Sequence, residues 1–424
     1  MSKKKQWYKL DLSANVYPTL QRKQFSSVYR ISVTLTEKIK PQFLQLALEK
    51  TLPRFPNMKV AMRKGVFWRY LEPNENPIPK IQPDICNPCM PMHMKGNNRY
   101  LLRIYYYDRQ ISLEAFHSLA DGYGGLVFLK TLAAVYLQTQ GISIPNDYGV
   151  LNIDEEADPG ELEDAYIKYA NSKVLPARSQ GKAYRIRSTK EPFYTLNVIS
   201  GNMRVEDLKT VSKGYKVTIT EYLNSVLLYA LLQKQKSDKV RKEKPVKIAM
   251  PVDLRRLFPS NTLRNFITMI YPGIDPRLGE YTFEEILKQT HHFMRYYIND
   301  KFLNADITTN AYTQQNIWVR VVPLFIKDFV VRQFYIKVQD KQSTAGLTNL
   351  GIVETPEEMK GYIERFDVLM GQPFSPRTNC AVISFQGVTT INFASSIVES
   401  DVERYFFRKL VEDGVPVTIR SNRK

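Results

Sequence analysis

The amino-acid sequence predicts an α/β (α+β) protein built from two similar lobes, each a mixed sheet with helices. Its 424 residues are enough for about two to three domains. Apolar residues make up 43% and charged residues 24%, an ordinary globular mixture that excludes a disordered chain. In both halves, segments that alternate like strands are interspersed with helix-like segments. We therefore expect an N-terminal lobe over 1–175 and a C-terminal lobe over 190–424, connected within the charged, Pro- and Ser-containing stretch 141–192.

The elements of the first lobe follow from local patterns. Residues 28–35 alternate as a half-buried strand does, and Pro41 suits the first turn of a helix over 41–52. We expect two strands that turn at Gly65 within 58–71, a loop over the proline-rich stretch 71–91, a hairpin of 100–107 and 111–116, and a helix over 126–138. This helix is apolar nearly all round, which predicts that it is buried.

The second lobe repeats this style. A strongly apolar helix over 220–235 begins after Thr218 or Thr220, either a suitable N-cap, with Glu221 in its first turn. We also expect strands at 193–199, 246–252 and 266–271, helices at 282–298 and 321–339, strands at 381–386 and 389–393 around Gly387, and a helix at 400–412.

The charge balance bears on partners and not on fold. Lys and Arg total 60 and Asp and Glu total 42, a net charge of +18. Such an excess fits nucleic acid, an anionic membrane surface, an acidic protein or a phosphorylated small molecule, and equally a generally basic surface. No run of about 18 apolar residues predicts a membrane span, and the basic start lacks the apolar stretch of a signal peptide. Three cysteines cannot form a disulfide framework, so we expect a cytoplasmic protein.

The segment from Glu114 to Gly125 combines chemistry with a turn. His117, one of four histidines, stands where a predicted strand ends, and Asp121 follows four residues later beside Gly122. Histidine is the side chain best suited to take a proton near neutral pH, and glycines allow close approach of the backbone. The alternative is a satisfied histidine at a strand end with Asp121 as a helix cap, and spacing alone leaves both open.

The motif His117-x-x-x-Asp121-Gly122 resembles the HxxxDG motif of the chloramphenicol acetyltransferase-like superfamily, which includes alcohol acetyltransferases and the condensation domains of peptide synthetases. Segments in the same order along nearly the whole chain add to the resemblance, closest to bacterial alcohol acetyltransferase-like proteins: 251–266, 348–351, and 386–387 with 391–393. Condensation domains carry two consecutive histidines, whereas Phe116 precedes His117 here. This departure argues against a condensation domain and not against acyl transfer.

The resemblance implies two coenzyme-A-dependent acyltransferase lobes around a tunnel, with the acyl thioester and the acceptor entering from opposite sides. His117 would remove the proton from a small alcohol or amine as it attacks the thioester, without a protein nucleophile. Acyl-CoA is then a cosubstrate and no cofactor is tightly bound. An acyl carrier protein as the donor stays open.

The resemblance also assigns supporting residues. Thr348 would donate to the oxygen of the tetrahedral intermediate, although a threonine bonded to strand-end backbone is an equal alternative. Asp121, beside Gly122, would point away from the cavity and pair with Arg255, or failing that with Arg256, behind the histidine-bearing loop.

Three other sequence features give weaker evidence of function. Cys86, Cys89 and His93 resemble part of a zinc site, but a fourth ligand is not evident, so a plain loop is the simpler interpretation and we assign no metal. His291 and His292 are adjacent and do not form an i, i+4 metal pair. The lysine-rich stretch 234–247 is either a solvated loop or a contact for CoA phosphates or an acidic carrier.

We therefore predict an acyltransferase of the alcohol O-acetyltransferase type. The rival hypothesis is a non-catalytic binding or interaction protein that keeps the two-lobed fold. A nucleic-acid binder is a distant third, since no recognised nucleic-acid motif accompanies the many tyrosines.

Overall fold

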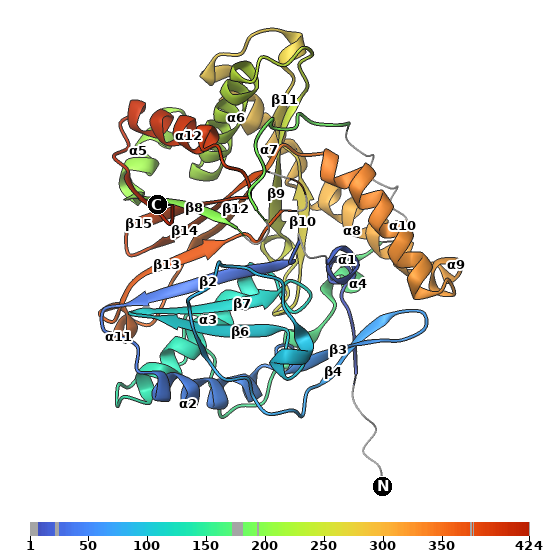
Figure 1. Ribbon diagram of the computed structural model, residues 1–424, viewed down its shortest axis with the longest axis vertical. Coiled ribbons are helices and arrows are strands. Elements are labelled where there is room, and N and C mark those ends of the chain that lie inside the picture. Colours follow the sequence, from blue (N-terminus) through green and yellow to red (C-terminus); the bar gives the residue numbers. More distant parts are fainter. Residues whose placement is uncertain are drawn as a thin grey trace.

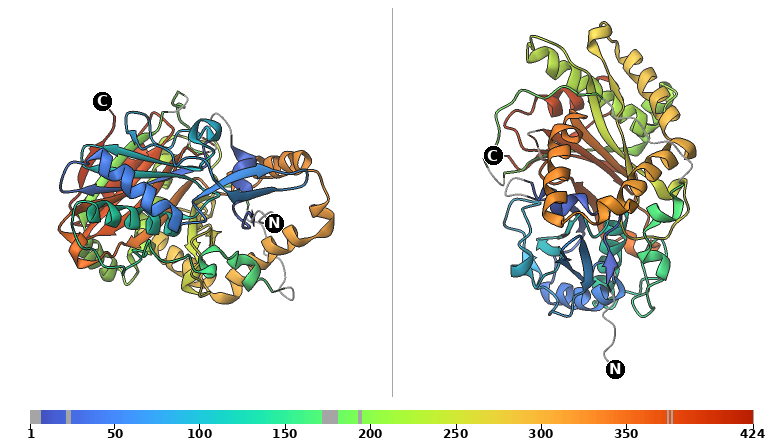
Figure 2. Two further views of the ribbon diagram at one scale, coloured as in Figure 1. Left: turned by 90° about the horizontal axis from the view of Figure 1, so that it is seen from below. Right: turned by 90° about the vertical axis from the view of Figure 1, so that its right-hand side faces the viewer.

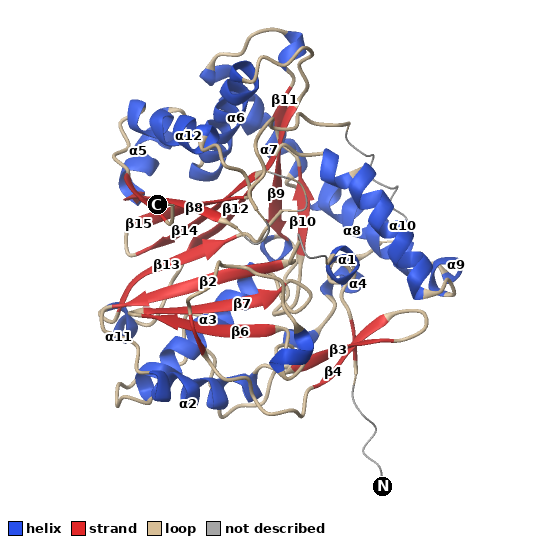
Figure 3. Ribbon diagram, in the orientation of Figure 1, coloured by secondary structure: helices blue, strands red, loops and turns tan. Residues whose placement is uncertain are grey.

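The computed structural model describes residues 7–21, 25–171, 181–192, 195–373, 375 and 377–423. Two large sheets lie one above the other in Figure 1, and helices cover the outer side of each. Figure 3 shows the same layers by type of structure, with strands in the middle and helices outside. The predicted α/β class is thus confirmed.

The first-lobe sheet holds, among the described residues, five strands in the order β13-β2-β7-β6-β5. Their bounds are Ile363–Leu369, Val28–Leu35, Gln110–Phe116, Leu102–Tyr107 and Gln82–Pro83. Helices α2 (Pro41–Thr51) and α3 (Gly122–Gln138) pack together, and α3 lies against β2 and β7. All of α3 from Val127 to Leu137 is buried, as its apolar sequence predicts.

The second-lobe sheet runs β10-β9-β12-β14-β15-β8-β16, with β11 also paired to β9, within the described part of the chain. The bounds in that order are Ile267–Ile270, Val246–Asp253, Ala345–Ile352, Thr378–Phe385, Val388–Ser395, Asn197–Arg204 and Thr418–Ser421, and for β11 Gly273–Ile274. Its helices are α5 (Val205–Gly214), α6 (Ile219–Ser237), α7 (Phe283–Tyr297) and α12 (Asp401–Glu412). Thr218 caps α6 in a capping box with Glu221, which decides between the two predicted caps.

Smaller elements complete the fold beside these sheets. A short sheet joins β1 (Tyr8–Lys9), β4 (Arg69–Pro73) and β3 (Val60–Lys64). The remaining helices are α1 (Val16–Leu20), α4 (Ala165–Tyr169), α8 (Asp300–Gln315), α9 (Ile317–Arg320), α10 (Leu324–Lys337) and α11 (Glu357–Lys360). Figure 2 shows α8, α9 and α10 on one side of the molecule, apart from the helices that cover the sheets.

Most predicted elements are confirmed with small shifts at their ends, and a few are corrected. The strand expected at 193–199 runs over β8 instead, and its residues 193–194 lie outside the described residues. The helix expected from residue 126 begins at Gly122, because Asp121 caps it there. Helices α5 and α8 and strand β13 are not predicted by the sequence patterns.

The predicted lobe boundaries, 1–175 and 190–424, stay a prediction, and residues 172–180 of the connection are not described. One strand crosses between the two parts. β13, from the second half of the sequence, pairs antiparallel with β2 of the first, with Phe366 opposite Val33. It also packs beside β14 and β15, so it lies between the two sheets.

Candidate active site

His117 lies at the end of β7, in the turn that leads into α3. Its backbone N–H donates to Ser27 O at 2.9 Å, which ties the turn to the start of β2. The ring of Tyr17, from α1, is stacked on the imidazole with centroids 4.3 Å apart, and Tyr29 meets it edge-on at 5.1 Å. Aromatic rings thus fix the plane of a side chain that keeps partial exposure.

The tautomer of His117 follows from its hydrogen-bond partner in the second lobe. His117 Nδ1 lies 3.0 Å from Asn265 Oδ1, and Asn265 Nδ2 donates to Asp11 Oδ2 at 3.1 Å. A carboxylate only accepts, so the amide NH₂ must face Asp11 and the amide oxygen must face His117. Nδ1 therefore carries the proton, and Nε2 presents a lone pair.

The ionisation of His117 favours the same state. Burial lowers the pKa of His117 below its usual value of 6.5, against the opposing effects of Asp121, Asn265 and Asp11. The imidazole is consequently neutral at pH 7, which is the form that accepts a proton.

Asp121 directs its carboxylate away from His117, toward α3 and the second lobe. Oδ1 accepts from Gly124 N at 3.2 Å and so caps α3. Oδ2 accepts from Arg255 Nη1 and from Phe266 N, both at 2.9 Å. The aspartate and arginine expected to pair are thus in contact, and both side chains are buried.

Arg255 makes further contacts in both lobes. Its guanidinium also pairs with Asp253 at 2.9 Å and lies 4.7 Å from the centroid of the Tyr123 ring. Arg256, the fallback partner, is exposed and lies instead near Gly351.

Of the three glycines after Asp121, two lie where neighbouring atoms leave no room for a side chain. The glycines form the first turn of α3 and not a separate turn. A Cβ on Gly124 would lie 2.0 Å from Leu263 O, a backbone atom of the second lobe. One on Gly125 would lie 2.5 Å from the Tyr29 hydroxyl, whereas Gly122 has more room, with Leu350 at 3.4 Å. A side chain at Gly124 would therefore require the lobes to move apart, and one at Gly125 would have to displace Tyr29 within the first lobe.

Thr348 lies on β12, half-buried, and makes no hydrogen bond to His117 in the described structure. Two residues along the same strand, Leu350 packs beside Gly122, so this part of β12 borders the start of α3. The role of Thr348 as an oxyanion donor stays a prediction.

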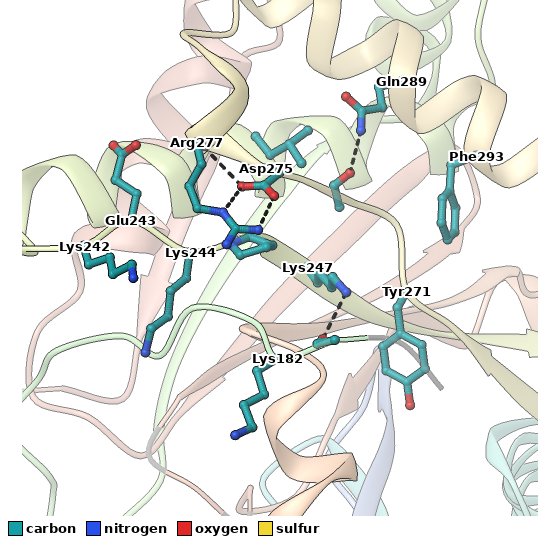
Figure 4. Close-up of a pocket in the computed structure, with 14 residues that line it drawn as sticks. Lys182, Lys242, Glu243, Lys244, Lys247, Tyr271, Asp275, Arg277, Gln289 and Phe293 are labelled. Atoms are coloured by element: carbon teal, nitrogen blue, oxygen red, sulfur yellow. Dashed lines mark hydrogen bonds and ion pairs between the residues drawn. The ribbon is translucent and has the colours of Figure 1, made fainter. Parts of the chain in front are cut away.

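A cavity with basic walls lies away from His117. It has a volume of about 790 Å³ and lies where β9 begins, beside β11 and α7 (Figure 4). Its charged lining residues are Lys182, Lys242, Glu243, Lys244, Lys247, Asp275 and Arg277. Arg277 pairs with Asp275 at 2.5 Å, which leaves lysines in excess. Lys247 and Asp253 are six positions apart on β9, about 20 Å along the strand, and Asp253 lies at the end nearer His117.

The lysines of the stretch 234–247 therefore fall into two groups. Lys234 is buried and pairs with Asp238 and Asp401, a structural role, while Lys242, Lys244 and Lys247 line the cavity. Their contact with CoA phosphates or an acidic carrier stays a prediction.

The cysteines near residue 90 face different surroundings. Cys86 is exposed, whereas Cys89 is buried and its backbone N–H donates to Glu114 Oε1. Among the described residues, no group of three or more His, Cys, Asp and Glu side chains could hold a metal ion. His291 Nδ1 lies 3.3 Å from Glu221 Oε1 on α6, and the rings of His291 and His292 meet edge-on at 5.5 Å.

The sequence patterns do not predict the partners of the imidazole. Asn265 belongs to the segment 251–266 that supports the resemblance, yet a single asparagine gives no signal of its role. Asp11 and Tyr17 fall in an irregular stretch without periodicity, so only the three-dimensional structure brings them to His117.

Comparisons with known proteins agree with the superfamily predicted from the motifs. The sequence profile of the alcohol acetyltransferase family matches residues 177–405, more than half of the chain. A search of the curated proteins finds no match.

Several solved structures share the fold at low sequence identity. A trichothecene 15-O-acetyltransferase from Fusarium sporotrichioides has a TM-score of 0.60 at 13% identity, over 96% of this chain and 94% of that one. A wax ester synthase/diacylglycerol acyltransferase from Marinobacter aquaeolei VT8 has 0.56 at 14%, over 96% and 98%. An F. graminearum protein complexed with coenzyme A and deoxynivalenol has 0.63 at 10%, over 97% and 99%. At these identities the likeness shows the fold alone.

Proposed function

The chain belongs to the alcohol acetyltransferase family and is an acyltransferase, and on that premise we propose its reaction. It moves an acyl group, acetyl in the simplest case, from a CoA thioester to the hydroxyl or amine of a small acceptor. His117 is the general base. The observation that carries this proposal is the orientation of its neutral imidazole, which directs a protonated Nδ1 at Asn265 and leaves Nε2 as acceptor.

The chemistry follows from that orientation. Nε2 takes the proton of the acceptor as the acceptor oxygen or nitrogen attacks the thioester carbonyl. The imidazolium that forms keeps its Nδ1–H bond to Asn265. The tetrahedral intermediate then expels the thiolate, which takes the proton back from Nε2 and leaves as free thiol. The Thr348 hydroxyl is our proposed donor to the intermediate's oxyanion.

The rival hypothesis, a non-catalytic binding protein, does not account for this arrangement. A protein that only binds needs neither a single histidine tautomer nor a relay of Asp11 and Asn265 to impose it. Aromatic and hydrogen-bonding contacts from two lobes hold the imidazole, which is the preorganisation that catalysis requires.

The acyl donor is a thioester of either CoA or an acyl carrier protein, and both of these groups are polyanionic. The F. graminearum neighbour was determined with coenzyme A, which supports CoA as cosubstrate. We assign the anionic end of the donor to the basic cavity, where Lys242 and Lys244 lie. Lys242→Glu with Lys244→Glu should then raise the KM for acyl-CoA with little change in kcat. Lys213→Glu, an exposed charge change on α5, should leave KM unchanged.

A thiol-release assay tests the reaction itself. Acyl-CoAs of increasing chain length are incubated with panels of alcohols, sugars and amines, and free thiol and acylated product are both measured. His117→Ala should lower kcat about a hundredfold to ten-thousandfold. His292→Ala, at an exposed position, is the control. Near-parent turnover by the His117 variant with a productive pair would show that another group is the base, and acceptor-independent binding without turnover would favour the rival.

The site of action that we expect is the cytoplasm, where acyl-CoA is available and thiols stay reduced. No helix in the described ranges is long and apolar enough to cross a membrane. Nucleic acid remains outside our expected partners.

A further inference from the structure

Helices α9 and α10 expose an unusual number of large apolar side chains. Trp318 is 77% exposed, Phe325 73% and Phe329 63%. Further exposed apolar residues on the same helices and the turn between them are Ile317, Val319, Val321, Ile326, Val330, Val331 and Phe334. Single exposed apolar residues are ordinary, but a contiguous apolar surface marks an interaction site.

The inner face of α10 is fixed to the first lobe. Asp328 pairs with Arg69 on β4 at 2.5 Å, and Arg332 Nη2 donates to Thr19 O at 3.1 Å. Leu324, Asp328, Arg332 and Tyr335 are three or four residues apart and so share one side of the helix. The apolar side chains on the opposite side consequently face away from the protein.

The hairpin of β3 and β4 extends the same surface. Leu324 N donates to Val66 O at 2.8 Å, and Lys327 Nζ donates to Phe67 O at 2.8 Å. At the hairpin tip, Val66 is 72% exposed and Trp68 46%. Figure 1 shows this tip reaching out beside α9 and α10. Segments far apart in sequence, 66–68 and 317–337, thus form one surface, here named the apolar tip.

Basic residues accompany the apolar tip. The stretch 317–337 carries Arg320, Lys327, Arg332 and Lys337, and its single acidic residue, Asp328, is neutralised by Arg69. The whole chain has a net charge of +18. Projecting aromatic and aliphatic side chains surrounded by cations match the boundary of an anionic lipid bilayer. Contact between two copies of this face would instead bring like charges together.

We propose that the apolar tip docks the protein on an anionic membrane surface, with its aromatic side chains seated among the headgroups and with the exposed Arg320 and Lys337 on the lipid phosphates. The contact is peripheral. Helix α1 lies between α10 and His117, because α10 packs on α1 and Tyr17 of α1 is stacked on that histidine. The proposal concerns binding and does not depend on the proposed reaction.

Vesicle co-sedimentation tests it. The parent protein should bind vesicles of phosphatidylcholine with about a third phosphatidylglycerol, bind pure phosphatidylcholine weakly, and be released by salt. Trp318→Ser with Phe325→Ser and Phe329→Ser should lower the partition coefficient about tenfold or more. Arg320→Glu with Lys337→Glu should lower binding to the anionic vesicles alone.

The matched control carries as many apolar-to-serine changes elsewhere: Ile85→Ser, Leu278→Ser and Val411→Ser, all exposed and away from the apolar tip. It should bind like the parent, and far-UV circular dichroism and the thermal midpoint show whether each variant is folded. Equal binding by parent and tip variant, or no binding by the parent, would overturn the proposal. A concentration-dependent dimer that is lost in the tip variant, without vesicle binding, would overturn it in favour of self-association.

Discussion

In the proposed reaction, Asn265 acts through His117. It makes no predicted contact with the reacting atoms, yet it sets which imidazole nitrogen is free. Asn265→Ala should lower kcat about tenfold to a hundredfold, because the ring loses its preferred tautomer, with a smaller change in KM. Asn152→Ala, near the surface, is the control. A variant with unchanged kcat and an unchanged pH profile would exclude a positioning role.

The low pKa of His117 predicts how activity depends on pH. With the neutral imidazole of His117 as the proposed base, activity should be lost as pH falls through the pKa in the folded protein, and burial places that pKa below 6.5. The acid limb of kcat/KM should therefore lie below pH 6.5. Profiles of kcat/KM against pH in several buffers measure it, and a limb at or above pH 6.5 would contradict the lowered pKa of the imidazole.

The ion pair of Asp121 and Arg255 should matter for stability as well as activity. Both side chains are buried and lie on different lobes. Asp121→Asn leaves Arg255 with only the partly exposed Asp253 as its ionic partner, so it should lower the free energy of unfolding by about 3 kcal/mol, whereas His117→Ala should lower activity alone. A double-mutant cycle with Arg255→Gln measures the coupling. Strictly additive losses would show that the two side chains do not interact in solution.

At the scale of residues, the sequence predicts only those site residues that stand in a recognisable motif. His117, Asp121 and Arg255 stand in recognisable segments, and the structure brings the last two into contact. Asp11 and Asn265 are beyond the reach of sequence patterns, because they meet 254 positions apart through the packing of both lobes. A hydrogen bond between distant residues leaves no periodicity for sequence analysis to detect.

At the scale of elements, α3 depends on a glycine that its own helical pattern does not explain. Gly124 faces the backbone of Leu263, where a Cβ would lie 2.0 Å from the carbonyl oxygen. Gly124→Ala should cost about 1 to 3 kcal/mol or more in the free energy of unfolding, since backbone cannot move aside as a side chain does. It should also lower activity by displacing Asp121 and His117.

A second glycine provides the control for that change. At Gly214, the last residue of α5, an added Cβ would meet nothing within 4 Å. Gly214→Ala should therefore be neutral or stabilising by about 1 kcal/mol, because alanine favours a helix. Denaturant unfolding of both variants measures the difference. Equal effects at the two positions would mean that the approach to Leu263 is looser than described.

Elements with complete local signals are predictable from the sequence, and the others are not. The helix α6 has a cap, an acidic first turn and an apolar body, so its position follows from its residues. Helix α8 is rich in Thr and Asn, which favour turns when taken alone, and its helical state reflects its packing on α4 and β10. Strand β13 forms where it does because it pairs with β2 at the edge of the first-lobe sheet.

At the scale of the whole molecule, the lobes are joined by more than their connecting chain. β13 supplies an edge strand to the first-lobe sheet, and two ion pairs, the buried Asp121–Arg255 and the partly buried Arg69–Asp328, link residues from the two halves of the sequence. Domains that merely touch unfold separately, but here neither lobe keeps its contacts when the other is lost.

We therefore expect the two lobes to unfold together. Calorimetry and far-UV circular dichroism should give one thermal transition with coincident midpoints. Asp121→Asn should lower that shared midpoint, because the pair it breaks belongs to both lobes, whereas Lys213→Glu on the surface should leave it in place. Two resolved transitions, of which Asp121→Asn moves only one, would mean that the strand exchange and the ion pairs do not couple the lobes. Acceptor and donor would then meet between two independent bodies, and the position of Asn265 against His117 would have to be re-formed in each catalytic cycle.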